Sequence, residues 1–294
     1  MKSGFVSLIG RPNVGKSTLL NALINRKVAI TSNKPQTTRN IIQGIYNEDD
    51  YQIVFVDTPG IHKPLNKLGK ILNKQAHSLT KDVDAILFLV DASENLGTGD
   101  KFIMESLKHS DVPVILVLNK IDRINDEQIF FKITEYKDMF PFAEIVPVSA
   151  IKKDNIARLI EVIKKYLTDE IKYFDDETFT SSSRNFMISE LVREKLLELT
   201  EQEIPHKITC ITTSYAEEKN IVNVTVEIIV DRDSIKRIVI GKQGSMLKLV
   251  GTKARADIEE LLDKKVYLEL FVKTIEKWHD KEKYLSELGF KENE

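Results

Sequence analysis

The stretch GRPNVGKS, Gly10 to Ser17, has the residue types and spacing that bind phosphate groups. The pattern Gly-x-x-x-x-Gly-Lys-Ser lies between an apolar run, 4–10, and an amphipathic segment, as a strand–loop–helix phosphate site requires. Backbone N–H groups and a helix N-terminus attract phosphates, and Lys16 adds a positive charge near the outer ones. The Ser17 hydroxyl is placed to hold Mg²⁺. The loop alone does not distinguish ATP from GTP, or a kinase from a hydrolase.

Further polar residues follow other apolar runs and indicate which nucleotide binds. Asp57, in VDTPG, can reach the magnesium shell, and the N–H of Gly60 can meet a terminal phosphate. In NKID, the Asp122 carboxylate can accept two hydrogen bonds from guanine, a pairing that adenine lacks. Asn119 and Lys120 would hold the base and the loops around it. In VSA, Ser149 and Ala150 would offer a backbone N–H to the guanine oxygen.

These motifs need a scaffold that brings strand ends to one edge. Up to about residue 167, short β-rich runs alternate with amphipathic helical patterns, which predicts a parallel sheet covered on both faces. The expected strands are 4–10, 51–57, 84–91, 112–119 and 144–150. The expected helical segments are 16–25, 66–77, 99–109, 126–139 and 155–167. The fold class is therefore α/β, doubly wound, over 1–167.

A second domain follows an acidic segment. Residues 168–184 carry five acids and then three serines, a composition that suits a solvated linker. Over 185–294 the expected order is helix, two alternating strands, short helix, long helix, strand and a C-terminal helical segment. This predicts a separate, small α+β domain.

Taken in order, GRPNVGKS, DTPG, NKID and SA resemble the signature of translation-factor-class GTPases, over roughly residues 3–167. A P-loop kinase would need no NKID. The resemblance implies a Ras-like G domain that binds GTP and GDP with Mg²⁺. The implied nucleotide-binding residues are Gly10, Arg11, Pro12, Asn13, Val14, Gly15, Lys16, Ser17, Thr18, Asp57, Thr58, Pro59, Gly60, Asn119, Lys120, Asp122, Ser149 and Ala150.

The same resemblance assigns the catalytic parts. The TTR element favours Thr38, with Thr37 close behind, as the threonine that senses the third phosphate, so Ser17, Thr38 and Asp57 are the expected metal ligands. The expected switch segments are 31–43 and 58–80.

Hydrolysis is expected to be slow without a partner. Ile61 stands where Ras-like proteins place the glutamine that orients water. Asn13 resembles the asparagine that related GTPases use to bind K⁺ beside the phosphates. Lys16, Asn13 and Thr38 are the expected catalytic residues.

A second glycine-containing loop, Gly241–Gly244, has the sequence GKQG. Its lysine is followed by glutamine, not by serine or threonine, which argues against a second nucleotide site. Between Ser234 and Arg255 every charged residue is basic. Together with the expected element order, this resembles a type II KH domain, whose GXXG loop clamps single-stranded RNA. The alternative is a plain turn between two helices. The expected RNA-binding residues are Arg237, Ile240, Gly241, Lys242, Gln243, Gly244, Ser245, Lys248 and Lys253.

Composition sets wider bounds. The 294 residues carry a net charge of −2, 42% are hydrophobic and there is one cysteine, which is typical of a globular protein in a reducing compartment. The sequence shows no signal peptide or membrane span, so we expect a cytoplasmic protein.

From end to end the chain resembles the Era family, a GTPase domain followed by one type II KH domain. The resemblance implies a factor that binds small-subunit (16S-type) rRNA near its 3′ end and acts in small ribosomal subunit assembly. It also implies some association with the membrane, which we expect to be peripheral and at the inner face of the cell membrane. We expect a monomer. Two other functional classes fit the sequence less well. A membrane-associated signalling GTPase lacks a basic amphipathic tail and a lipidation cysteine in this sequence. A metabolic nucleotide hydrolase would need a substrate pocket for which no residues are evident.

Overall fold

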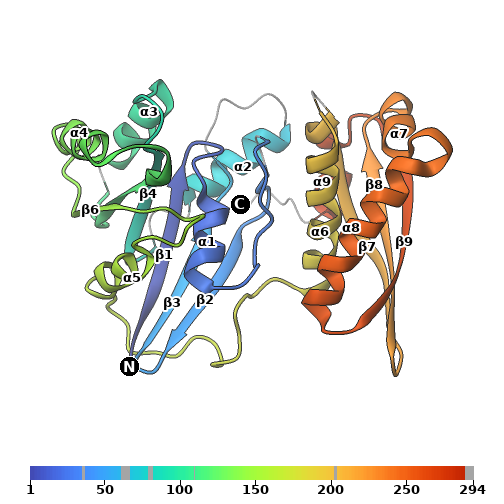
Figure 1. Cartoon of the computed structure of the whole chain (residues 1–294), viewed down its shortest axis with the longest axis horizontal. Helices are drawn as coiled ribbons and strands as arrows, with labels where there is room; N and C mark the ends of the chain where they lie inside the picture. The colour runs from blue at the N-terminus through green and yellow to red at the C-terminus, as the bar shows by residue number, and fades with distance from the viewer. Residues whose placement is uncertain (35–36, 61–66, 79–81, 109, 202–203, 289–294) are drawn as a thin grey trace. The chain divides into compact units, whose positions relative to one another are not determined.

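A computed structural model describes the chain except residues 35–36, 61–66, 79–81, 109, 202–203 and 289–294. The described residues form two compact units (Figure 1). Unit 1 consists mainly of Met1–Thr31, Thr38–Pro64 and Gly69–Ser181, and unit 2 mainly of Ser182–Glu294. Each unit has its own sheet and its own apolar core.

Within its described residues, unit 1 contains a six-stranded sheet with the order β2-β3-β1-β4-β5-β6. Neighbouring strands are parallel except β2, which runs antiparallel to β3. The strands are β1 (Lys2–Gly10), β2 (Ile42–Glu48), β3 (Tyr51–Asp57), β4 (Ala85–Asp91), β5 (Val114–Asn119) and β6 (Glu144–Pro147). The predicted α/β fold class is confirmed. Parallel order brings the ends of β1, β3 and β5 to one edge.

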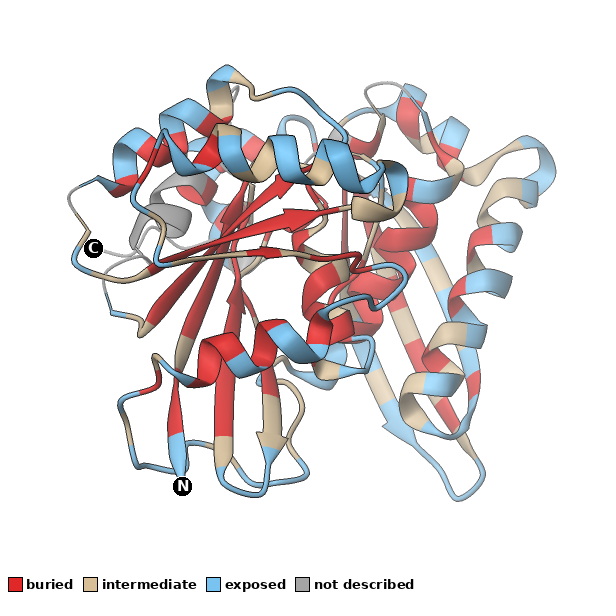
Figure 2. Cartoon of the chain, turned by 60° about the vertical axis from the view of Figure 1, so that its left-hand side comes forward, coloured by how far each residue is buried: buried red, intermediate tan, exposed pale blue. Residues whose placement is uncertain are grey.

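Helices cover the buried strands on both sides, as Figure 2 shows. Side chains of α3 and α4 join one apolar cluster with β4 and β5, which includes Phe88, Leu116 and Tyr136. Helix α4 begins where the Asn125 side chain accepts the Gln128 N–H at 2.9 Å and the Gln128 side chain accepts the Asn125 N–H at 3.0 Å. The helices are α1 (Lys16–Ile24), α2 (Lys67–Ser78), α3 (Thr98–Leu107), α4 (Asp126–Lys137) and α5 (Ile156–Lys164).

Strand β2 was not predicted from the sequence. Its residues, IQGIYNE, place a glycine inside the strand and mix apolar with polar positions, so neither a continuous apolar run nor strict alternation is present. Pairing with β3, Ile45 opposite Val54, forms the strand. A tertiary contact therefore overrides a weak local preference.

Residues 168–181 also differ from the expected solvated linker, because they pack against unit 1. Gln52 is fully buried, and its side-chain amide donates to the Phe174 carbonyl at 2.8 Å and accepts from the Tyr173 and Phe174 N–H groups. Further along, Ile45 N–H donates to the Phe179 carbonyl at 3.0 Å. The acidic side chains of this segment are compatible with packing, because these contacts use the backbone groups of Tyr173, Phe174 and Phe179.

Unit 2 contains a three-stranded sheet in its described part, ordered β7-β8-β9, with β7 antiparallel and β9 parallel to β8. Helices α6 and α8 pack on it around an apolar core that includes Val226, Ile228 and Ala254. The elements are α6 (Arg184–Leu199), β7 (Ile208–Glu217), β8 (Ile221–Val230), α7 (Asp233–Ile240), α8 (Ser245–Leu262), β9 (Lys265–Thr274) and α9 (Glu282–Glu287). This is the predicted α+β order.

No helix in the described part of the chain combines the length and the apolar character needed to cross a membrane.

The contacts of Gln52 give a test of the docked segment. We expect Gln52→Ala to raise hydrogen exchange at the Tyr173 and Phe174 amides at least about tenfold, because both lose a buried acceptor. Gln43→Ala is the control, since its side-chain oxygen accepts one exposed bond, from Ser181. Unchanged exchange at Tyr173 and Phe174 in Gln52→Ala would show that other contacts hold the segment.

Candidate functional site

The loop between β1 and α1 has a backbone that tolerates glycine alone at two points. Gly15 has φ +99°, and a Cβ there would lie 2.3 Å from Nδ2 of Asn119. A Cβ on Gly10 would lie 2.5 Å from the carbonyl oxygen of Leu89. The predicted phosphate loop is therefore packed tightly against the neighbouring strand ends. It continues directly into the N-terminus of helix α1, where backbone N–H groups can bind phosphate.

Lys16 is held inside this loop. Its Nζ donates to the carbonyls of Gly10 and Arg11, both at 3.2 Å. Burial lowers the pKa of Lys16, and the charge of Asp57 opposes that shift. The ammonium therefore lies at the centre of the loop, where a phosphate oxygen would find a desolvated cation.

Three side chains predicted as metal ligands come together in unit 1. Ser17 Oγ lies 2.7 Å from Oδ2 of Asp57 and 2.7 Å from Oγ1 of Thr38, which itself lies 3.3 Å from Asp57 Oδ2. Thr37 does not join them, because its hydroxyl donates to the Lys34 carbonyl at 2.7 Å. The structure thus groups Thr38, and not Thr37, with Ser17 and Asp57.

This oxygen cluster fits a hard divalent cation. Burial raises the pKa of Asp57, and the nearby charge of Lys16 acts against this. Its Oδ1 is buried and receives no hydrogen bond from any residue that the structure describes. Hydroxyl and carboxylate oxygens are the ligands Mg²⁺ prefers, usually beside waters and phosphates. The donor set therefore suits Mg²⁺.

The DTPG segment continues from β3 past the phosphate loop. Thr58 is buried, and its hydroxyl donates to the Leu8 carbonyl at 2.8 Å. A Cβ on Gly60 would lie 3.0 Å from Pro12 N, so the two loops touch here. The predictions for Ile61 and for residues 61–66 and 79–80 of the segment 58–80 fall outside the described residues.

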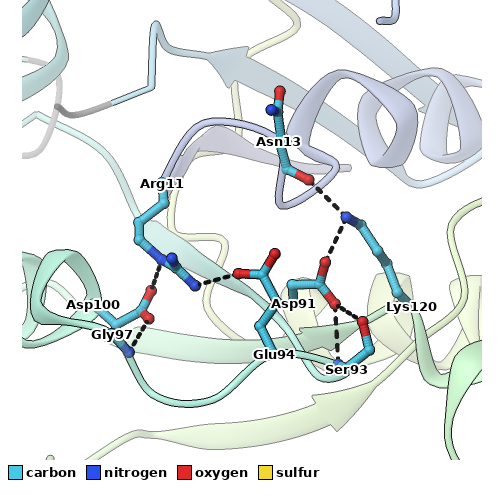
Figure 3. A network of polar contacts seen from close by, with 8 residues as sticks. All are labelled: Arg11, Asn13, Asp91, Ser93, Glu94, Gly97, Asp100 and Lys120. Atoms are coloured by element: carbon cyan, nitrogen blue, oxygen red, sulfur yellow. Dashed lines mark hydrogen bonds and ion pairs between the residues drawn. The ribbon is translucent and has the colours of Figure 1, made fainter. Parts of the chain in front are cut away.

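At the end of β5, Asn119 joins three segments. It is 2% exposed; its Nδ2 donates to the Val14 carbonyl at 2.8 Å, and its Oδ1 accepts from the Ala150 N–H at 3.1 Å. Lys120 Nζ donates to the Asn13 carbonyl at 2.7 Å and to Asp91 Oδ2 at 2.6 Å (Figure 3). The NKID motif thus ties the phosphate loop to the region expected to hold the base.

Asp122 is oriented by a neighbour from the VSA motif. Ser149 Oγ donates to its Oδ1 at 2.5 Å. The backbone N–H groups of Ser149 and Ala150 donate to Asp154 O and Asn119 Oδ1 respectively. The structure therefore supports Ser149 as a partner of Asp122, while an N–H bond from this segment to guanine stays a prediction.

Unit 2 presents the second glycine loop between α7 and α8. Gly241 and Gly244 have φ of +74° and +78°, and a Cβ on Gly241 would lie 2.7 Å from the backbone N of Met246. Around Gly244 there is open space within 4 Å. Lys242 and Gln243 are exposed between them. The loop can therefore approach a polymer backbone closely on the Gly244 side.

The basic side chains near this loop are available for a partner. Arg237, Lys242, Lys248 and Lys253 are exposed and form no ion pair with a described residue. Two apolar side chains that the sequence analysis did not select, Ile238 and Leu249, are 47% and 44% exposed on α7 and α8. The sequence could have indicated both residues, because each is an apolar residue that lies outside the set of helix positions expected to face the core.

Comparisons with known proteins agree with this two-site arrangement. A family model described as a 50S ribosome-binding GTPase matches residues 5–120, and one described as a KH domain matches residues 203–279. The chain is 48% identical to the GTPase Era of Clostridium kluyveri over 99% of this chain and 100% of that protein. The chain belongs to the Era family of GTPases. It therefore hydrolyses GTP to GDP and phosphate, as predicted.

Solved structures of Era share the whole architecture. An Era variant from Aquifex aeolicus bound to GDP and AlF4⁻ superposes with a TM-score of 0.95 at 38% identity, covering 99% of each chain. An Era structure in complex with MgGDPNP and nucleotides 1506–1542 of 16S ribosomal RNA matches with the same TM-score, identity and coverage. The G domain followed by a KH domain is thus confirmed.

Gly15 offers a direct test of the nucleotide site. Gly15→Ala places a Cβ against Asn119 in a left-handed backbone, so we expect guanine nucleotide affinity to fall at least about tenfold. Gly251→Ala in α8 is a matched control, because its Cβ would make ordinary contact, 3.4 Å from Leu270. Equilibrium titration with a fluorescent GDP analogue measures both. Equal affinity in Gly15→Ala and the wild type would contradict the assigned loop geometry.

Proposed function

We propose that this chain is a GTP-switched factor that binds small-subunit (16S-type) ribosomal RNA near its 3′ end and acts in small ribosomal subunit assembly. The observation that carries the proposal is the pair of glycine loops on separate units. Gly10–Ser17 encloses a buried lysine that suits the phosphates of GTP. Gly241–Gly244 is flanked by exposed basic side chains that suit a sugar-phosphate backbone.

Each part of the second loop has a role in this proposal. Gly241 and Gly244 let the RNA backbone approach, with Gln243 and Ser245 beside it. The side chains of Arg237, Lys242, Lys248 and Lys253 neutralise phosphates, and Ile240 lies at the end of α7, next to the loop. The Era complex with 16S RNA nucleotides supports this choice of polymer.

The RNA site is tested by placing acids in the loop. We expect Gly241→Asp with Gly244→Asp to abolish binding of a single-stranded 3′ segment of 16S rRNA, because two carboxylates would face its phosphates. GDP affinity should stay within twofold of the wild type. Asn220→Asp, in the exposed turn between β7 and β8, is the control and should bind RNA normally. Unchanged RNA affinity in the double variant would place the RNA site elsewhere.

For hydrolysis we propose that Mg²⁺ is held by Ser17, Thr38 and Asp57 with the nucleotide phosphates. Mg²⁺ supplies neutralisation of charge on the transferred phosphoryl group. Lys16 contributes a fixed positive charge at the outer phosphates. Asn13, with φ +65°, is proposed to bind K⁺ in the place of an arginine finger.

The roles of Mg²⁺ and K⁺ can be tested separately with two variants. We expect Asp57→Asn to lose most of the Mg²⁺ dependence of GDP dissociation, because the carboxylate charge at the site disappears. Hydrolysis by the wild type should be faster in K⁺ than in Na⁺ buffer, and Asn13→Ala should remove that difference. Equal wild-type rates in the two buffers would exclude a role for K⁺. A wild-type GDP dissociation rate that EDTA leaves unchanged would exclude the Mg²⁺ site.

The proposal has further parts. They are a G domain over 1–167, a linker over 168–184 whose residues 168–181 pack against the G domain, and a KH-type domain over 185–294. They also include a monomeric, cytoplasmic protein with peripheral contact at the inner face of the cell membrane. Flotation with anionic vesicles tests the membrane contact, and absence of the protein from the vesicle fraction would remove it.

A further inference from the structure

The segment between β4 and α3, Asp91–Asp100, contacts the phosphate loop at two points. It has the sequence DASENLGTGD and belongs to none of the GTPase motifs named above. Figure 3 shows its acidic side chains turned toward Arg11 and Lys120. Arg11 is a predicted nucleotide-binding residue, so the partners of its guanidinium decide how it can act.

Arg11 is held by two carboxylates. Its Nε donates to Asp100 Oδ1 at 2.8 Å, and one terminal nitrogen donates to Glu94 Oε2 at 2.9 Å. Asp100 is fully buried, and its other oxygen accepts the Gly97 N–H at 3.0 Å, at the start of α3. Burial acts to lower the pKa of Arg11, but Asp100 and Glu94 together raise it. The guanidinium charge is therefore neutralised within the protein.

The shape of the segment fits the Arg11 side chain. A Cβ on Gly99 would lie 2.7 Å from Cδ of Arg11, and one on Gly97 would lie 3.3 Å from its NH1 nitrogen. The aliphatic part of Arg11 thus lies directly against this backbone. Both the charge and the packing fix one arrangement of the side chain.

The second contact reaches Asn13 through Lys120. Asp91 Oδ2 lies 2.6 Å from Lys120 Nζ, which donates to the Asn13 carbonyl at 2.7 Å. Asp91 Oδ1 accepts from Ser93, from its N–H at 3.0 Å and its hydroxyl at 2.6 Å. The same segment therefore fixes the loop on both sides of Pro12.

We propose that Asp91–Asp100 braces the phosphate loop, and that Arg11 and Asp100 are positioning residues for the phosphate end of the nucleotide. The proposal deepens the GTP site described above and rests on it. Arg11 acts through its own backbone and that of Asn13, because its charge is occupied by Asp100 and Glu94. Without Arg11 the buried Asp100 carboxylate would lose its cation, and without Asp100 the Arg11 guanidinium would lose the buried contact that fixes it, so the loop should lose its fixed arrangement.

The test measures dissociation of a fluorescent GDP analogue from the full chain. We expect Arg11→Gln and Asp100→Asn each to speed dissociation at least about tenfold. Asp100→Asn keeps a side-chain oxygen for the Gly97 N–H, so α3 retains its N-terminal contact. The double variant should dissociate no faster than the faster single variant, because both act through one pair. The dissociation rate of Arg11→Lys should lie between those of the wild type and Arg11→Gln, since lysine keeps the positive charge but lacks the several N–H donors of the guanidinium.

Controls separate this role from general stability and from the GTP site itself. Lys132→Gln breaks an ion pair with Glu135 on α4 and should leave dissociation unchanged. Dissociation rates of the single variants within twofold of the wild type would contradict the proposed role of Arg11 and Asp100. Additive effects in the double variant would also contradict it. If the neutral variants do not fold, a wild-type rate in Arg11→Lys overturns it and an intermediate rate supports it. A wild type that binds no guanine nucleotide would instead overturn the GTP site.

Discussion

The nucleotide site depends on the two hydrogen bonds of one buried side chain, Asn119. Its amide joins the Val14 carbonyl of the phosphate loop to the Ala150 N–H of the VSA segment. A buried amide left without partners costs free energy, so the three segments keep a common arrangement. Gly15 makes this contact sterically feasible, because a Cβ at this position would lie 2.3 Å from Nδ2 of Asn119. The order of the strands brings these segments near each other, and the hydrogen bonds of Asn119 then fix the distance between the phosphate loop and the VSA segment.

Other polar side chains around Asn119 also join separate segments of the site. Asp57 orients Ser17 and Thr38 on one side, and Lys120 joins Asn13 to Asp91 on the other. In each case a charged group that burial disfavours is compensated by a fixed partner. Charges placed in this way need little rearrangement when phosphates bind, which is the condition for electrostatic stabilisation of phosphoryl transfer.

Much of this arrangement followed from local patterns in the sequence. The phosphate loop, DTPG and NKID are short motifs after apolar runs, and parallel strands bring such ends together. The pairing of Arg11 with Asp100 could not be predicted, because the residues are 89 positions apart and an acid in a helix first turn has a local explanation. Strand β2 depends on pairing with β3, and the docked segment 168–181 depends on contacts with the buried Gln52. Local composition indicates neither of these tertiary contacts.

We propose that the two glycine loops of this Era GTPase have separate ligands, with Gly10–Ser17 binding GTP and Gly241–Gly244 binding RNA. RNA crosslinking in cells, with the crosslinked residues mapped, tests it most directly. We expect crosslinks to the 3′ region of 16S rRNA at Gly241–Ser245 and at neighbouring basic residues such as Lys248. Crosslinks confined to residues 1–167, or none to ribosomal RNA, would contradict it.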